Sequence, residues 1–110
     1  MDDEVAFLRE MLEIYSPSGR EAALAAYLAG RMRQMGFQVR RDGVGNVIGT
    51  LGEGPWELML LGHIDTVEGF IPVRLEDGRL YGRGAVDAKG PLAAFILAAA
   101  RVGSQPGVRV

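Results

Sequence analysis

The sequence contains no cysteine and a single histidine, and both facts limit the chemistry open to it. Without cysteine, neither a disulfide framework nor a thiolate metal site can form, so a metal ion would need His, Asp or Glu ligands. The 12 basic and 14 acidic residues are scattered and give a formal charge of −2, so no basic stripe is available to bind a phosphate backbone. We therefore expect no nucleic-acid partner.

Long apolar runs are also missing. The longest, residues 91–100, is about half of the ~20 residues that a helix needs to cross a bilayer. The amino terminus (Met1 to Glu4) is acidic, whereas a secretory signal peptide begins with basic residues. We therefore expect a cytoplasmic protein with no membrane partner.

The composition that remains, 110 residues of which 48% are hydrophobic, is sufficient for one compact core. Near the amino end, apolar residues recur at helical spacing twice. This spacing predicts one helix that ends near Tyr15 and a second that ends at Gly36. Ser18 and Glu21 have the spacing of a capping box, which would begin the second helix.

The rest of the chain alternates strand and helix signals. Asp42-Gly43 and Asp77-Gly78 each predict a tight turn between two short strands. A strand that begins at Trp56 is almost wholly apolar, which is typical of a strand covered on both faces. The predicted elements are strands 37–41, 44–51, 56–61, 73–76, 79–82 and 107–110, with a deeply buried helix that starts at Pro91. This order predicts one α/β domain over residues 1–110.

Two residues of chemical interest follow the strand that begins at Trp56. His63 and Asp65 come just after its carboxyl end, the edge at which α/β sheets bind ligands. Residues i and i+2 of an extended chain point the same way, so Asp65 could accept the second ring N–H of His63 and prepare it for a metal. A histidine hydrogen-bonded at a strand end, with Asp65 as a turn residue, is the alternative, and the spacing alone favours it.

A third candidate, Asp87, lies between a glycine-rich segment and the helix that starts at Pro91. A lone carboxylate there could bind a metal, or it could cap the helix, and the local pattern supports both equally. A dinucleotide site is rejected. Gly82 and Gly84 lack the third glycine at the required position, where the carboxylate of Asp87 would repel a pyrophosphate.

The segments GHIDTV and YGRGAVDAKGPLAAF together resemble the paired signatures of the zinc aminoacylase family. That family includes acetylornithine deacetylase, succinyl-diaminopimelate desuccinylase and carboxypeptidases. The resemblance covers about the last half of the chain. It implies a three-layer helix-sheet-helix fold with a mixed, mostly parallel sheet, of which this chain would be the amino-terminal part of a zinc-exopeptidase-like catalytic domain.

The same resemblance implies a site with two divalent ions, zinc or cobalt. His63 would bind one ion, Asp65 would orient His63 for catalysis, and Asp87 would bridge both ions before a cis peptide to Ala88. A carboxylate shared between two ions suits the hydrolysis of an amide.

The family also uses a consecutive glutamate pair, one residue as general base and one as metal ligand, followed by a further acid and a histidine. The sequence has no such pair and only one histidine. We therefore expect a piece of a longer hydrolase that is inactive alone. The alternative is a non-catalytic α/β module that binds a partner protein.

Within the family, the segments SPSGRE and IPVRLEDGRLYGRGAVDAKGPLAAF are most similar to hydrolases that release lysine, and sometimes ornithine, from an amino-group carrier protein. The expected substrate is thus an N-acylated amino acid or a carrier protein bearing lysine, in lysine or arginine biosynthesis. An incomplete sheet would leave an apolar face uncovered, so we also predict a homo-oligomer or self-association of the chain.

Overall fold

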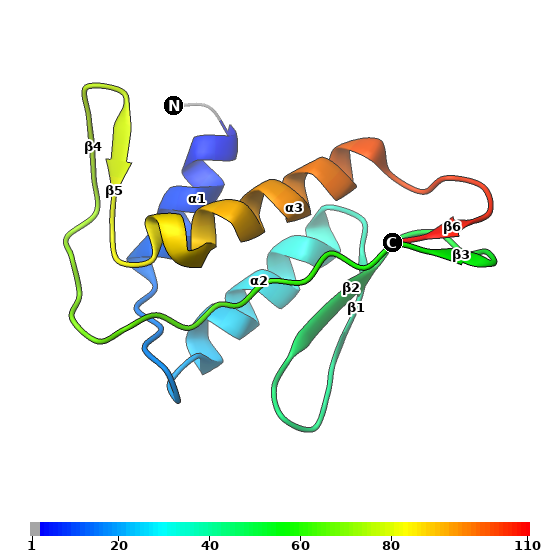
Figure 1. Ribbon diagram of the computed structural model, residues 1–110, viewed down its shortest axis with the longest axis horizontal. Helices are drawn as coiled ribbons and strands as arrows, with labels where there is room; N and C mark the ends of the chain where they lie inside the picture. The colour runs from blue at the N-terminus through cyan, green and yellow to red at the C-terminus, as the bar shows by residue number, and fades with distance from the viewer. Residues whose placement is uncertain (1–2) are drawn as a thin grey trace.

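The computed structural model of the chain describes residues 3–110. Its helices lie together, with short strands around them (Figure 1). None of the helices within residues 3–110 has the length and apolar character needed to cross a membrane. In chain order the elements are α1 (Asp3–Glu13), α2 (Ala22–Gln34), β1 (Gln38–Arg41), β2 (Val47–Thr50), β3 (Trp56–Glu57), β4 (Arg74–Glu76), β5 (Arg79–Tyr81), the π-helical turn η1 (Ala85–Lys89), α3 (Gly90–Val102) and β6 (Val108–Arg109).

The three α-helices share one apolar core. Each helix contributes the residues that recur on one of its faces, and the hairpin of β1 and β2 closes the core from one side. Its buried members are Phe7, Met11, Leu24, Leu28, Met32, Phe37, Leu51, Ala93 and Ile96. The predicted α/β class is confirmed. Within this core, α1 and α3 pack against each other, and both contact η1.

The strands pair as three two-stranded sheets, two antiparallel (β1 with β2, β4 with β5) and one parallel (β3 with β6). Leu51 and Val110 exchange two backbone hydrogen bonds of 2.9 Å, which brings β6 beside the end of β2. The strands at this corner therefore follow the order β1-β2-β6-β3. Within residues 3–110 they do not extend into the mostly parallel sheet that was predicted, because only β3 and β6 run parallel.

Three predictions about single elements need correction. The strand predicted over residues 56–61 pairs only at Trp56 and Glu57, and the rest of that segment is exposed rather than covered. The helix from Pro91 is α3, but only Ala93 and Ile96 are buried in it. The two strands around Asp42-Gly43 are joined by a five-residue loop, residues 42–46, in place of a tight turn.

The hairpin of β4 and β5 confirms its sequence signal. Asp77 and Gly78 adopt φ angles of 51° and 74°, and both are positive, as the predicted turn type requires. The strands pair from Arg74↔Tyr81 to Glu76↔Arg79. This hairpin precedes η1 and so leads the chain back to the candidate site.

Candidate functional site

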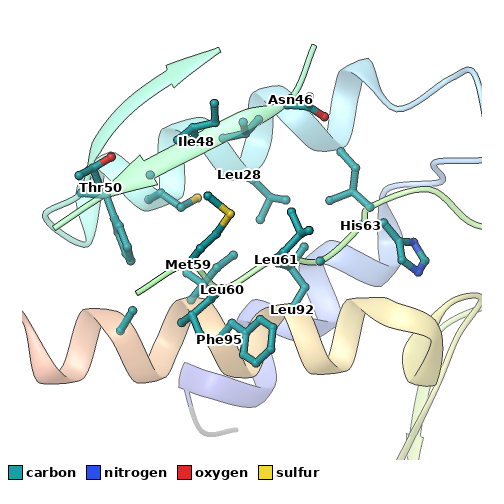
Figure 2. Close-up of a pocket in the computed structure, with 18 of the residues that line it drawn as sticks. Leu28, Asn46, Ile48, Thr50, Met59, Leu60, Leu61, His63, Leu92 and Phe95 are labelled. Carbon is teal, nitrogen blue, oxygen red and sulfur yellow. The ribbon is translucent and has the colours of Figure 1, made fainter. Parts of the chain in front are cut away.

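The ring of His63 lies between two carboxylates. Its Nδ1 atom is 3.1 Å from Oδ1 of Asp65, and its Nε2 atom is 3.1 Å from Oδ1 of Asp87. His63 directly follows the extended segment of residues 58–62, which passes between β2 and α3 in Figure 2. The structure thus brings all three sequence-predicted site residues together at one end of this segment.

Asp87 occupies η1, where the chain turns sharply before α3. Gly84 precedes this turn with a φ of 82°, and a Cβ atom there would lie 2.6 Å from Cγ2 of Thr66, so only glycine fits. The peptide from Asp87 to Ala88 is cis, as the family resemblance implied. The N-cap of α3 is Lys89, without a side-chain cap. The alternative that Asp87 caps this helix is therefore wrong.

Ser18 holds the second oxygen of Asp65. Its hydroxyl donates a hydrogen bond of 2.5 Å to Oδ2 of Asp65. The contact exists because residues 16–18 run beside residues 64–66, with Ser18 N donating to Thr66 O and Thr66 N donating to Ser16 O. The predicted capping box is wrong, since Glu21 itself is the N-cap of α2 and Ser18 faces the site.

These contacts shift the ionisation of the site. The hydrogen bond with Asp87 is the main cause that raises the pKa of His63 above its ordinary value, with smaller contributions from Asp65. The hydrogen bond from Ser18 is the main cause that lowers the pKa of Asp65. The imidazole therefore keeps its proton to a higher pH than an ordinary histidine does, and a metal ion would compete with that proton for Nε2.

The geometry of His63 and Asp87 fits two ligands of one ion. Zinc lies about 2.0–2.2 Å from imidazole nitrogen and carboxylate oxygen, so ligand atoms on one ion are roughly 3 Å apart, close to the observed 3.1 Å. An imidazole with a carboxylate also suits zinc or cobalt. Within residues 3–110, however, no group of three or more His, Cys, Asp or Glu side chains could hold a metal. The remaining ligands would have to come from elsewhere.

Lys89, the only lysine in the sequence, anchors the turn that carries Asp87. Its side chain is 1% exposed, and Nζ donates hydrogen bonds of 2.9 Å to the backbone carbonyls of Met11 and Ile14, at the end of α1. Burial lowers the pKa of Lys89 to about 8. Lys89 was not among the site residues predicted from the sequence. The sequence feature that could have indicated it is that every other basic side chain is an arginine, whereas the one lysine lies two positions after Asp87.

A cavity of about 640 Å³ opens beside the three site residues. It extends from His63 and Asp87 to the β4–β5 hairpin, where Arg83 and Tyr81 line it. Arg83 is held in place because its Nε donates a 2.6 Å hydrogen bond to the carbonyl of Gly69. A small molecule could therefore approach the ring of His63 from this side.

Comparison with known proteins gives relatives over most of the chain. A protein of Pyrococcus abyssi, named as a candidate hydrolase of LysW-lysine and LysW-ornithine, is 50% identical over 98 residues, which are 88% of this chain and 29% of that protein. A LysW-lysine hydrolase of Deinococcus radiodurans is 50% identical over 92 residues, 83% of this chain and 25% of that protein. The chain thus spans less than a third of the length of these relatives.

The fold also has a known counterpart. The crystal structure of human carnosine dipeptidase 1 superposes with a TM-score of 0.76 at 25% identity, over 98% of this chain and 30% of that one. A family model described as Peptidase family M20/M25/M40 matches residues 59–109, the segment that contains His63, Asp65 and Asp87. The resemblance predicted from the two motifs is therefore confirmed, since residues 59–109 of this chain match the model of Peptidase family M20/M25/M40.

Proposed function

We propose that the chain forms the amino-terminal part of the catalytic domain of a metal-dependent hydrolase. The reaction is cleavage of the amide bond between an acyl or carrier-protein group and the amino group of lysine or ornithine, in cytoplasmic amino-acid biosynthesis. The observation that carries the proposal is the 3.1 Å approach of His63 Nε2 to Asp87 Oδ1, which fits two ligands of one ion. The substrate class rests on the names of the relatives, which are given as hydrolases of LysW-lysine and LysW-ornithine.

In this proposal His63 would hold one divalent ion, zinc or cobalt, through Nε2. Asp65 orients the ring through Nδ1, and Ser18 in turn orients Asp65. Asp87, whose side chain is 88% exposed, would be shared with a second ion. When bound, such ions would supply polarisation of the scissile carbonyl and activation of a water molecule.

The chain does not supply the whole machinery. It has no consecutive glutamate pair and no second histidine, so the general base and the further ligands belong to polypeptide outside these 110 residues. The protein carrier or acyl group and the amino acid would reach the site through the cavity beside Arg83. By itself the 110-residue chain should bind metal weakly and turn over no substrate.

A chimera tests the proposal. The chain replaces the 92 matched residues of the Deinococcus radiodurans LysW-lysine hydrolase, and release of lysine from LysW-lysine is measured. We expect activity that a chelator removes and that zinc or cobalt restores. His63→Ala and Asp87→Asn should each lower kcat by about 100-fold or more, because ligand loss exceeds the 10–100-fold effects of the surrounding groups. Asp77→Asn, in the exposed hairpin turn, is the matched control and should change little.

Two results would contradict the proposal. One is a folded chimera that stays inactive with both metals, and the other is a His63→Ala chimera that is as active as its parent. The second candidate, a non-catalytic module that binds a partner protein, would gain from either result. The observation that favours this second candidate is the set of exposed apolar side chains at residues 58–61, which a partner protein could cover.

A further inference from the structure

Lys89 is the one charged side chain that is buried within residues 3–110. It is 1% exposed, and taking an ammonium group out of water costs free energy unless the group is well bonded. Its Nζ atom donates hydrogen bonds of 2.9 Å to the backbone carbonyls of Met11 and Ile14. A methionine would fill similar space without the cost of a buried charge. The ammonium group therefore has a role that packing alone does not require.

Both acceptors lie at the carboxyl end of α1. The last four carbonyl groups of a helix have no partner inside the helix, and this end carries a partial negative charge. The last turn of α1 contains no basic residue of its own. Lys89, which is 75 and 78 positions away from its two acceptors, supplies the donors and the positive charge that this helix end needs.

The turn that carries Asp87 is held at both of its ends. At its start, Gly84 packs against Thr66, so closely that a Cβ atom at position 84 would lie 2.6 Å from Cγ2 of the threonine. At its end, the backbone N–H of Lys89 donates a 2.9 Å hydrogen bond to the carbonyl of Gly84. The same residue therefore closes the turn through its backbone and attaches it to α1 through its side chain.

The connector of residues 14–18 contacts both parts of the site. The carbonyl of Ile14 accepts from the side chain of Lys89. Ser16, which is 0% exposed, donates through Oγ to the carbonyl of Ile64 at 2.7 Å. One short stretch of backbone thus bonds both to the lysine and to the segment that follows the imidazole.

The carboxylate of Asp87 depends on this attachment for its position. It is 88% exposed, and the hydrogen bond that its side chain makes within residues 3–110 is the one to His63. We propose that Lys89 is a positioning residue, which sets the carboxylate of Asp87 against the imidazole of His63 by tying the turn to the end of α1. Use of this pair to bind a metal rests on the proposed function, whereas the spatial role of Lys89 does not.

A lysine that only stabilises the fold would behave differently. Its loss would lower the free energy of unfolding and leave the folded chain unchanged. Loss of a positioning lysine changes the folded chain itself, so the surroundings of the imidazole change even where the chain is fully folded. His63 is the only histidine in the sequence, so its ring nitrogens give unambiguous signals in a long-range proton–nitrogen correlation spectrum.

The experiment compares these spectra, at one neutral pH and without metal, for the 110-residue chain, Lys89→Met and Asp87→Ala. Asp87→Ala defines the signals of an imidazole that has lost its partner. We expect Lys89→Met to move the His63 signals by about half of that change or more, because it releases the turn that carries the carboxylate. The control is Ile96→Val, which removes a buried methylene from α3 and should lower stability without moving the His63 signals.

The absence of cysteine allows a chemical rescue. Lys89→Cys is alkylated in the unfolded chain and then refolded. Bromoethylamine rebuilds a side chain of lysine's length that ends in an ammonium group, and propyl iodide builds one of the same length without the charge. The aminoethyl chain should restore the parent signals of His63, whereas the propyl chain should resemble Lys89→Met.

Parent signals of His63 in a folded Lys89→Met chain, with only a lower unfolding midpoint, would overturn the proposal. An aminoethyl chain that behaves like the propyl chain would also overturn it, because the ammonium group would then have no effect on position.

If the methionine and propyl chains do not fold, Lys89→Gln decides. Its amide keeps an N–H donor but its side chain is one bond shorter, so the turn must move toward α1 to keep the contact. Unchanged His63 signals in folded Lys89→Gln would contradict the positioning role. An inactive chimera alongside the expected spectra would count against the proposed function alone.

Discussion

The imidazole of His63 and the carboxylate of Asp87, 24 residues apart in the sequence, meet with 3.1 Å between Nε2 and Oδ1. Two unrelated local structures deliver them. One is the exposed segment that follows β3, and the other is the sharp turn η1 before α3. Two ligands of one metal ion must approach each other in this way, so the pair is a candidate for binding a shared ion.

Metal binding by the 110-residue chain should depend on this pair. We expect a weak site for Zn²⁺ or Co²⁺ in isothermal titration calorimetry, and we expect His63→Ala or Asp87→Asn to lower its affinity by at least about tenfold, since each removes one of two side-chain ligands. Asp77→Asn serves as the matched carboxylate control and should leave the affinity unchanged. Equal affinity in all four chains would show that the ions bind elsewhere.

Ser18 should affect the same site through Asp65. Ser18→Ala removes the hydroxyl that donates to Asp65 Oδ2, so the carboxylate that orients His63 becomes free to rotate. Groups that orient a metal ligand typically change affinity by about 10–100-fold, and we expect a loss near the lower end because the site is exposed. The readouts are the metal affinity of the chain and the visible spectrum of bound Co²⁺.

The control for Ser18 is Ser104→Ala, which removes an exposed hydroxyl far from the site along the chain. Its affinity and Co²⁺ spectrum should match those of the parent. If Ser18→Ala changes only the unfolding midpoint and not the Co²⁺ spectrum, its role is to hold residues 16–18 in place and not to orient Asp65.

Lys89→Met should destabilise the fold. The substitution keeps an apolar side chain of similar length but leaves the carbonyls of Met11 and Ile14 without their donor. Leaving buried acceptors unpaired costs about 1–3 kcal/mol, which urea denaturation at neutral pH can measure. Arg33→Met, on the exposed side of α2, is the control and should stay within about 0.5 kcal/mol of the parent.

The pH dependence of stability gives a second test of Lys89. Burial lowers the pKa of Lys89 to about 8 in the folded chain, against an ordinary value of 10.5. Between these pH values the unfolded chain binds more protons, so this lysine makes the free energy of unfolding rise with pH. Urea denaturation from pH 8 to about 9.5 should show this rise in the parent and not in Lys89→Met. A parallel slope in both chains would mean that other groups cause it.

The exposed apolar side chains of residues 58–61 should also make the 110-residue chain associate with itself. Met59, Leu61 and Trp56 are all more than 70% exposed, and the edge of residues 59–62 is unpaired in the described structure. Sedimentation velocity at micromolar concentration should detect species larger than the monomer. Leu61→Lys should reduce them, whereas Val102→Lys, at the exposed end of α3, should not. A strictly monomeric parent chain would contradict this prediction.

Local sequence determined the features that depend on neighbouring residues alone. Asp77-Gly78 predicted a hairpin because few residue pairs accept two positive φ angles, and the turn has them. The spacing of His63 and Asp65 put both side chains on one side of an extended segment, where Nδ1 and Oδ1 are 3.1 Å apart. The helices were found from apolar periodicity for the same reason.

Tertiary structure decided the features that depend on distant segments. Ser18 resembled a helix cap until the chain of residues 64–66 came beside it, 47 positions away, and offered a carboxylate instead. Lys89 found its two acceptors at the end of α1, more than 70 residues earlier. Residues 58–61 have the apolar composition of a buried strand, but they are exposed. Burial requires a neighbouring element that covers the strand, and the local sequence does not specify whether that element is present.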